Sequence, residues 1–138
     1  MRNILRISLP LLLCAVLLLS LGGAALAAPN YSSWFKSDYM ELNALELLPS
    51  KFQNLDLTKP ISRQEMCELA VPALEKVTGN AIEPSRSDYF PDTRSSSIVK
   101  AHELGIVNGY EDGTFRPDRS LTRAELSTIV WRINHYYD

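Results

Sequence analysis

The stretch SLTRAELSTIVWRI, residues 120–133, carries the strongest fold signal in the chain. Thr122 and Glu125 have the spacing of a capping box, in which the hydroxyl accepts the amide of the third helical residue and the carboxylate accepts the amide of the cap. This spacing predicts a helix that begins after Thr122 and has Arg123 as its first residue. A cation at that position faces the positive end of the helix dipole, which costs about 0.3–1 kcal/mol.

A second stretch, PISRQEMCELAVPAL at residues 60–74, repeats this arrangement 60 positions earlier. Ser62 and Glu65 form its capping box, and Arg63 is its first helical residue. Apolar residues follow both boxes at the spacing of an amphipathic helix. They are Met66, Leu69, Ala70, Ala73 and Val77 in the first stretch and Leu126, Ile129, Val130, Ile133 and Tyr137 in the second. The chain therefore contains two copies of one helical unit.

A shorter helix is predicted upstream of each long one. Ser33 would cap a segment that ends before Pro49, and Thr93 or Ser95 would cap a segment that ends at Gly105. Their expected inner faces are Phe35, Tyr39, Leu42 and Leu45 in the first copy and Ile98 and Ala101 in the second. These elements predict an all-α fold, a small bundle of tandem helix–loop–helix repeats with short ordered loops. The expected divisions are a first repeat at residues 28–79, a linker at 80–88 and a second repeat at 89–138.

Residues 1–27 have the composition of a secretory signal peptide. Arg2 and Arg6 precede an apolar run at residues 9–21, and Ala-Leu-Ala at residues 25–27 is a cleavage motif. A retained membrane anchor is the alternative, because the uncharged run is long enough to span a bilayer. We expect the protein to be exported.

The charge of the remaining chain excludes a general attraction to nucleic acid. Without Arg2 and Arg6, residues 28–138 hold 12 Lys and Arg against 16 Asp and Glu, a net charge of −4. No basic field is therefore available for nucleic acid or anionic lipid. Membrane contact is expected only if the N-terminal segment stays uncleaved, and an anionic ligand must be bound by individual arginines.

Residue type and spacing also argue against metal and cofactor sites. Cys67 is the single cysteine of residues 28–138, so no internal disulfide is expected. It is interpreted as a small buried hydrophobe. Together with His102 and His135 it forms no recognisable metal-ligand pattern. We expect neither a metal nor a cofactor.

Residues at particular positions also argue against a calcium site and a glycoside hydrolase site. An EF-hand in the loop around Gly113 would need acidic ligands where Tyr110 and Arg119 stand. A glycoside hydrolase needs two carboxylates across a cleft, and the repeated acids, Glu65 and Glu125, are both expected to serve in capping boxes. We expect no enzymatic activity.

The two copies resemble the S-layer homology family. The resemblance rests on FPD at residues 90–92 and on LGIVNGYEDGTFRPDRSLTRAEL at residues 104–126. Residues 32–71 are similar to a divergent form of the same module, anchored by Trp34 and by ISRQE at residues 61–65. This form has Glu46 where the family usually has glycine.

This resemblance implies non-covalent attachment to the bacterial cell wall. Modules of the family typically occur in threes and bind secondary cell-wall polysaccharide, often pyruvylated, in grooves between neighbouring repeats. The main contact is the arginine of the Leu-Thr-Arg-Ala-Glu motif, which corresponds here to Arg123 and, in the divergent copy, to Arg63. The first helical residue points away from the buried stripe, and a guanidinium can bind a carboxylate by two hydrogen bonds. In the alternative, each arginine hydrogen-bonds a loop carbonyl or an acid such as Asp118.

Further candidate ligand residues are Trp34, Gly113, Arg116 and Asp118. Trp34 could stack on a sugar or fill the core, and Gly113 forms a tight turn with Asp112. Arg116 and Asp118 could contact the ligand or form surface ion pairs. The rival function is a protein-interaction module without glycan binding, which would tolerate salt. Because stacked repeats normally need three or more units, we expect self-association or contact with another surface protein of the family.

Overall fold

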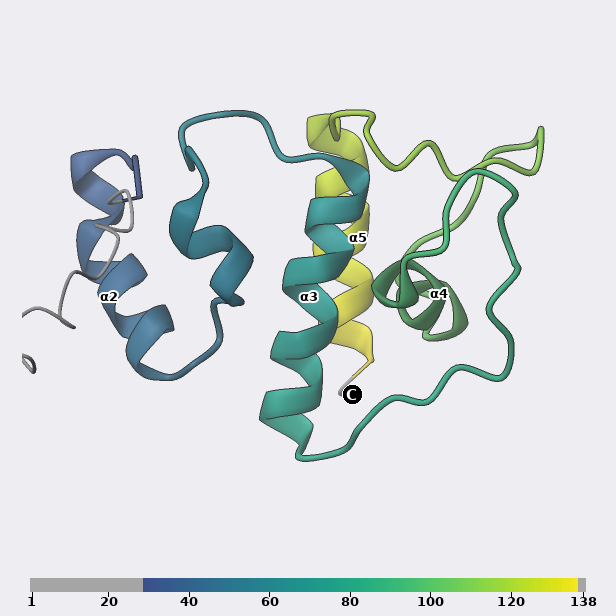
Figure 1. The fold of residues 1–138 in the computed structure, drawn as a ribbon, viewed down its shortest axis with the longest axis horizontal. Helices are drawn as coiled ribbons and strands as arrows, with labels where there is room; N and C mark the ends of the chain where they lie inside the picture. The colour runs from purple at the N-terminus through teal and green to yellow at the C-terminus, as the bar shows by residue number, and fades with distance from the viewer. Residues whose placement is uncertain (1–28, 137–138) are drawn as a thin grey trace, which may run out of the picture.

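The computed structural model describes residues 29–136, so the predicted signal peptide at residues 1–27 lies outside the described part of the chain. The elements in chain order are η1 (Ser33–Phe35), α2 (Lys36–Ala44), η2 (Ser50–Asn54), α3 (Arg63–Thr78), α4 (Ser96–Glu103) and α5 (Arg123–His135), as Figure 1 shows. Residues 29–136 thus form four α-helices, two short 3-10 helices and no β-strand, which confirms the all-α prediction. No helix in this range is long and apolar enough to cross a membrane.

The two long helices begin where the capping boxes predicted. At α3 the Glu65 amide donates to the Ser62 hydroxyl at 3.1 Å, and the Ser62 amide donates to the Glu65 carboxylate at 2.8 Å. Thr122 and Glu125 repeat both hydrogen bonds at α5, at 3.2 and 2.8 Å. Local sequence therefore fixes the starts of α3 and α5.

The first short helix begins later than predicted. Ser33 opens the 3-10 turn η1, and α2 starts at Lys36, so the prediction that Ser33 caps this helix is wrong. Aromatic packing holds the segment instead, because the Phe35 ring lies 6.4 Å from the rings of both Tyr31 and Tyr39. No residue of α2 is buried.

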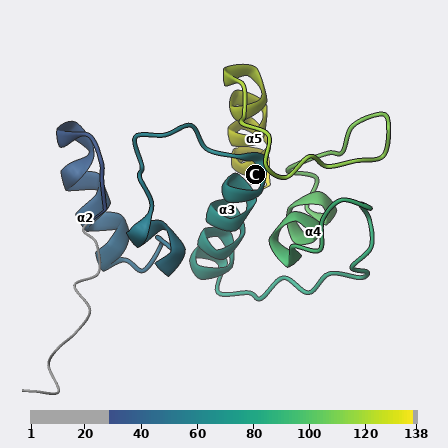
Figure 2. The same ribbon diagram turned by 45° about the horizontal axis from the view of Figure 1, so that its top comes forward.

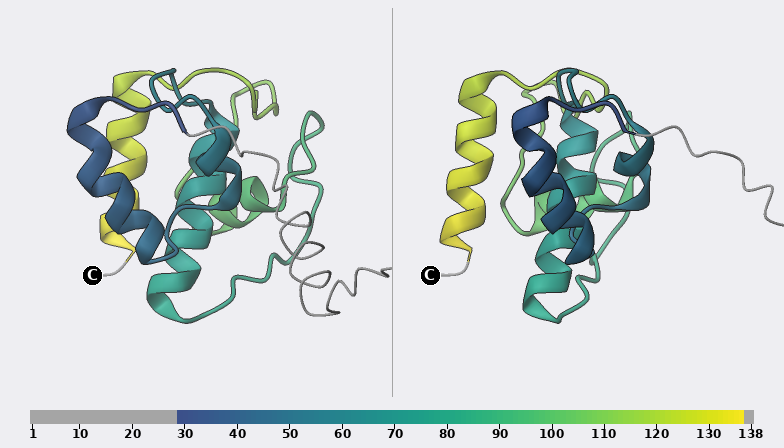
Figure 3. Two further views of the ribbon diagram at one scale, coloured as in Figure 1. Left: turned by 60° about the vertical axis from the view of Figure 1, so that its left-hand side comes forward. Right: turned by 90° about the vertical axis from the view of Figure 1, so that its left-hand side faces the viewer.

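The core lies between α3 and α4, and α4 follows Ser95, one of its two predicted caps. The buried apolar cluster consists of Cys67, Val71, Leu74, Phe90, Ile98, Ala101, Ile106, Val107, Phe115 and Ile129. Figures 1 and 2 show α3 between α4 on one side and α2 with η2 on the other. Within α5 the buried residue is Ile129 alone, and Figure 3 shows this helix at the edge of the molecule.

The stretch predicted as a linker, residues 80–88, is irregular but attached to the helices. The Ile82 amide donates to the Glu75 carboxylate at 2.9 Å, and the Ser85 amide donates to the Glu103 carboxylate at 2.9 Å. Ile82 also packs against the core cluster.

A short antiparallel contact joins the two copies just before their long helices. The Arg63 amide donates to the Arg119 carbonyl at 2.9 Å, and the Leu121 amide donates to the Ile61 carbonyl at 3.1 Å. The loop of the second copy therefore crosses the start of α3, and this crossing places the side chains described next.

Candidate functional site

Arg63 is the first residue of α3, and only 7% of it is exposed. Its Nε donates to the Phe115 carbonyl at 2.9 Å, and its Nη2 donates to the Asn108 carbonyl at 2.7 Å. The expectation that this arginine points away from the buried side is wrong, because the loop of the second copy covers the start of α3. Arg63 instead follows the alternative in which loop carbonyls hold the guanidinium.

The Arg63 guanidinium also lies against two aromatic rings. Its Cζ is 4.4 Å from the ring centroid of Phe115 and 4.8 Å from that of Tyr110. Cation–π attraction is strongest where the cation is desolvated. In addition, Nη1 lies 3.7 Å from Glu125 Oε1. These contacts offset the cost of burying the charge.

Glu125 connects the start of α5 to this loop. Its Oε2 accepts the Thr122 amide at 2.8 Å, while Oε1 accepts the Tyr110 hydroxyl at 3.1 Å and Arg119 Nη1 at 2.6 Å. The hydrogen bond from the Thr122 amide, helped by those from the Thr122 hydroxyl and Arg119, lowers the pKa of Glu125 to about 2. The carboxylate is therefore charged at neutral pH, and its capping role still leaves one oxygen for cations.

A cavity of about 310 Å³ opens beside these groups. Its lining residues are Arg63, Val107, Asn108, Gly109, Tyr110, Ala124, Glu125, Thr128, Ile129 and Arg132. Arg132 donates from Nη1 to the Ile106 carbonyl at 3.2 Å. It was not a candidate from the sequence. Glu125, Thr128 and Arg132 have the i, i+3, i+7 spacing of one helix face, which is the signal that points to it.

The predicted turn at Gly113 is present next to this cavity. Gly113 has a φ of 79°, in the left-handed region that favours glycine. Asp112 accepts the Thr114 hydroxyl at 2.6 Å and Arg116 Nη2 at 2.8 Å. The Thr114 hydroxyl and the Arg116 guanidinium hold the pKa of Asp112 well below its usual range. Arg116 therefore forms an exposed ion pair with Asp112, and its guanidinium carbon lies 4.2 Å from the ring centroid of Tyr110.

Arg123 lies outside the cavity. It is exposed, and no hydrogen bond or ion pair engages its side chain within residues 29–136. The next two residues, Ala124 and Glu125, do line the cavity. Asp118 is also exposed and is not among the lining residues. The two arginines of the capping boxes thus occupy opposite environments.

Trp34 lies in the first copy and is 77% exposed, so the alternative in which it fills the core is wrong. It borders a separate depression of about 200 Å³ together with Ser32, Phe35 and Leu57. The structure therefore does not bring Trp34 to the cavity that Arg63 lines.

Cys67 is 1% exposed, and burial raises the pKa of its thiol to about 12. The thiol is therefore protonated and unreactive at neutral pH. Among the described residues, no group of three or more His, Cys, Asp or Glu side chains is placed to hold a metal ion.

Comparison with known families identifies the part of the chain that carries the loop and the start of α5. Residues 90–127 match the family described as the S-layer homology domain. This segment is an S-layer homology domain. The resemblance predicted for the second copy is thereby confirmed, while the domain status of the first copy stays a prediction. Arg63 and Arg132 both lie outside the matched segment.

The chain is also similar to parts of longer curated proteins. It is 34% identical over 84 residues to a cellulosome-anchoring protein of Acetivibrio thermocellus, a match that covers 55% of this chain and 19% of that protein. It is 50% identical over 34 residues to cell surface glycoprotein 1 of the same organism, covering 25% of this chain and 2% of that protein. An amylopullulanase of Thermoanaerobacterium thermosulfurigenes is 35% identical over 77 residues, or 51% of this chain and 4% of that enzyme. The chain thus spans a small fraction of each relative, and no solved structure matches it significantly.

Proposed function

We propose that the protein attaches non-covalently to the bacterial cell surface by binding a carboxylate-bearing wall polysaccharide, such as a pyruvylated glycan. The S-layer homology domain supports surface attachment, as does the similarity to proteins named for anchoring and for the cell surface. The observation that carries the proposal is the cavity bordered by the guanidiniums of Arg63 and Arg132. In a chain of net charge −2, such local cations are what an anionic ligand requires.

In this proposal Arg132 binds the ligand carboxylate directly. Within residues 29–136 its Nε and one of its two Nη atoms have no hydrogen-bond partner, so a planar guanidinium edge is available for two parallel bonds. Arg63 contributes a fixed positive charge, since the Phe115 and Asn108 carbonyls hold it in place. The Glu125 carboxylate and the exposed amide of Asn108 suit hydroxyl groups of the sugar.

The remaining candidates have supporting roles in the proposal. Gly113 and Arg116 shape the loop beside the cavity, and Arg116 also lines a depression next to it. Arg123 offers a free guanidinium to ligand from outside the cavity. Trp34 and Asp118 would contact only a polymer that extends past the cavity.

Sedimentation with purified cell walls tests this proposal. Replacing Arg132 by Ala removes charge-assisted hydrogen bonds of about 1.5–3 kcal/mol each, so binding should weaken about tenfold or more. Arg132→Lys keeps the charge without the planar fork and should recover only part of the binding. The matched control is Arg86→Ala, because Arg86 is exposed, contacts its neighbours Asp88 and Tyr89, and does not line the cavity.

A second test uses cell walls from which mild acid has removed the ketal-linked pyruvate. The wild-type protein should bind them weakly, and added salt should weaken binding to untreated walls. Equal binding to both wall preparations, or an unchanged affinity of Arg132→Ala, would contradict the proposal. Arg123→Ala, measured in parallel, shows whether the free arginine contacts glycan.

A protein-interaction module is the second candidate function, favoured by a different observation. A cavity of about 460 Å³ with a mostly apolar lining lies in the first copy, and Arg132 is not among its lining residues. Its lining includes Phe35, Leu42, Leu48 and Phe52. Apolar docking there would survive high salt, unlike binding through arginine.

A further inference from the structure

The contact between the two copies has an inserting side and a receiving side. The inserting side is α3, which presents Arg63 at its start and Cys67 and Val71 along the face that packs with α4. The receiving side is the second copy, which presents Ile98 and Ala101 of α4 to α3. Its loop carbonyls and Glu125 receive Arg63, as described above.

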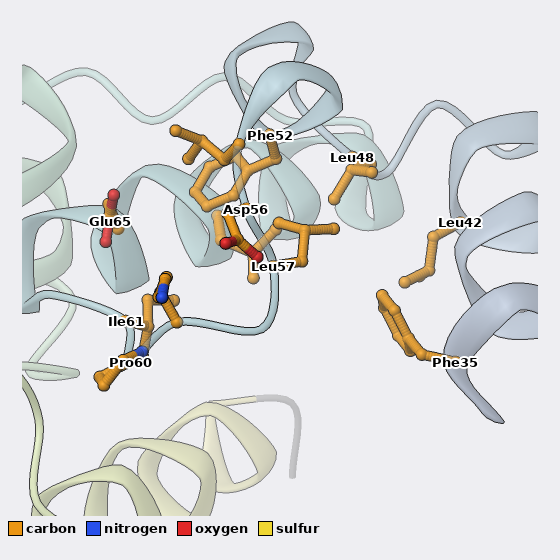
Figure 4. A pocket seen from close by; sticks show the side chains of 12 residues that line it. Phe35, Leu42, Leu48, Phe52, Asp56, Leu57, Pro60, Ile61 and Glu65 are labelled. Atoms are coloured by element: carbon orange, nitrogen blue, oxygen red, sulfur yellow. The ribbon is translucent and has the colours of Figure 1, made fainter. Parts of the chain in front are cut away.

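The receiving side of the first copy has no occupant within residues 29–136. The apolar cavity of about 460 Å³ lies there, between α2, η2 and the start of α3, as Figure 4 shows. Its lining includes Glu65 and Leu69, which correspond at the 60-residue offset to Glu125 and Ile129 of the other cavity. Leu42 of α2 also lines it.

Glu65 resembles Glu125 in that one carboxylate oxygen serves the capping box and the other can accept a cation. Its Oε2 accepts the Ser62 amide, whereas no hydrogen bond or ion pair to its Oε1 is present in the described part of the chain. The corresponding oxygen of Glu125 accepts Arg119 and faces Arg63. Within residues 29–136, a carboxylate oxygen without a partner therefore lies at the edge of an apolar cavity without an occupant.

The inserting side of the second copy is equally unoccupied. At the 60-residue offset, Val130 and Trp131 of α5 correspond to Ala70 and Val71 of α3. Ala70 and Val71 are 7% and 1% exposed, but Val130 and Trp131 are 46% and 59% exposed. Arg123, the counterpart of the buried Arg63, likewise has no partner within residues 29–136. Residues 29–136 thus carry both an inserting helix and a receiving cavity that no other part of this range occupies.

We propose that the apolar cavity of the first copy receives α5 of a second copy of this chain, with Arg123 of one protomer beside Glu65 of the other. Charge complementarity supports this occupant, because an unpaired guanidinium meets an unpaired carboxylate oxygen at the rim of an apolar contact. The contact between Arg63 and Glu125 within one chain provides its pattern. The proposed contact between protomers joins two different surfaces, so it is heterologous. Such a contact either closes into a ring of protomers or continues as an open chain of them. This proposal does not depend on glycan binding.

Analytical ultracentrifugation of the purified protein tests the association. The wild-type mass should rise with concentration, and Trp131→Glu and Leu42→Glu should each remain monomeric. Met40→Glu is the matched control, because Met40 is 60% exposed on α2 and does not line the cavity. It should behave like the wild type. Circular dichroism confirms that each variant is folded.

Mixing the two monomeric variants separates this arrangement from a symmetric one. Leu42→Glu keeps an intact α5, and Trp131→Glu keeps an intact cavity, so an equimolar mixture should form a heterodimer with one working contact. Arg123→Ala and Glu65→Gln, of which the latter preserves the capping box, should each weaken association about tenfold. A wild-type protein that stays monomeric at all concentrations overturns the proposal. So does self-association of either single variant, or a mixture that remains monomeric. Cell-wall sedimentation is scored separately, so failure of one proposal is distinguishable from failure of the other.

Discussion

Replacing Arg63 by alanine tests the contact that joins the two copies, and Arg123 supplies a matched control. Each arginine is the first residue of a helix that begins with a capping box, so both substitutions change the same local position. Their surroundings differ, because Arg63 is buried and hydrogen-bonded whereas Arg123 is exposed. Any difference between the two variants therefore measures the non-local environment rather than helix propensity.

The contacts of each arginine determine how much free energy of unfolding its replacement should cost. Arg63→Ala leaves the carbonyls of Phe115 and Asn108 without their donor, and hydrogen bonds to a charged group contribute about 1.5–3 kcal/mol each. Removing one partner of a buried ion pair costs about 3–5 kcal/mol, but Arg119 still neutralises Glu125 in the variant. Because one guanidinium makes all these contacts, the terms overlap, and we expect a loss of about 3–5 kcal/mol. Arg123→Ala should change stability by less than about 0.5 kcal/mol, in the stabilising direction, because a cation leaves the positive end of a helix dipole.

Urea unfolding followed by far-ultraviolet circular dichroism measures both variants, at a protein concentration where sedimentation shows a monomer. Equal slopes of free energy against denaturant show that the variants expose the same surface on unfolding. Should Arg63→Ala prove too unstable to fold, Arg63→Lys keeps the charge but loses the fork that reaches both carbonyls, and it should show an intermediate loss. A loss below about 1 kcal/mol for Arg63→Ala, or equal losses for the alanine variants, would refute the reasoning.

Three other predictions concern the titration of Glu125, the reactivity of Cys67 and the packing at Gly109. The pKa of Glu125 is lowered to about 2 from a usual value of 4.5, so its contribution to the free energy of unfolding is complete above pH 4.5 and is lost as the pH falls towards 2. Glu125→Gln should remove that part of the acid dependence, and an identical pH profile would contradict it. The Cys67 thiol should not react with Ellman's reagent until the protein is denatured, because the thiolate is the reactive form and burial disfavours it. Gly109→Ala would place a Cβ 2.5 Å from a ring carbon of Phe90, so the melting temperature should fall by the equivalent of about 1–3 kcal/mol, whereas an unchanged value would show that the ring can move.

The starts of the two long helices could be predicted from sequence because every interaction that fixes them is local. The Ser62 and Thr122 hydroxyls each bond an amide three residues later, and the carboxylate at that position returns the bond. The start of α2 could not be predicted in this way. Ser33 is a good cap in isolation, but the packing of Phe35 against neighbouring aromatic rings decides where the α-helix begins.

The candidate site was predicted only in part, because its geometry depends on residues far apart in the chain. Arg63 donates to a carbonyl 52 positions away. No local sequence pattern predicts that the loop of the second copy crosses the start of α3. Arg132 was missed for a related reason. A cation in the last turn of a helix is ordinary, being favoured there by the helix dipole, and it becomes a cavity residue only when the loop is placed beside α5.

Arg63 and Arg123 show why a repeated motif does not determine a repeated role. Their local sequences give the same capping box and the same first helical residue, so the intrinsic cost of the cation is the same in both copies. That cost is offset at Arg63 because the second copy packs against the start of α3 and provides carbonyls, aromatic rings and an acid. Arg123 has no such neighbour within residues 29–136, and the apolar residues beside it on α5 are exposed as well. The same local sequence thus forms a structural contact where another copy packs against it and leaves an exposed arginine where none does, which makes Arg123 the more informative of the two residues for ligand and partner experiments.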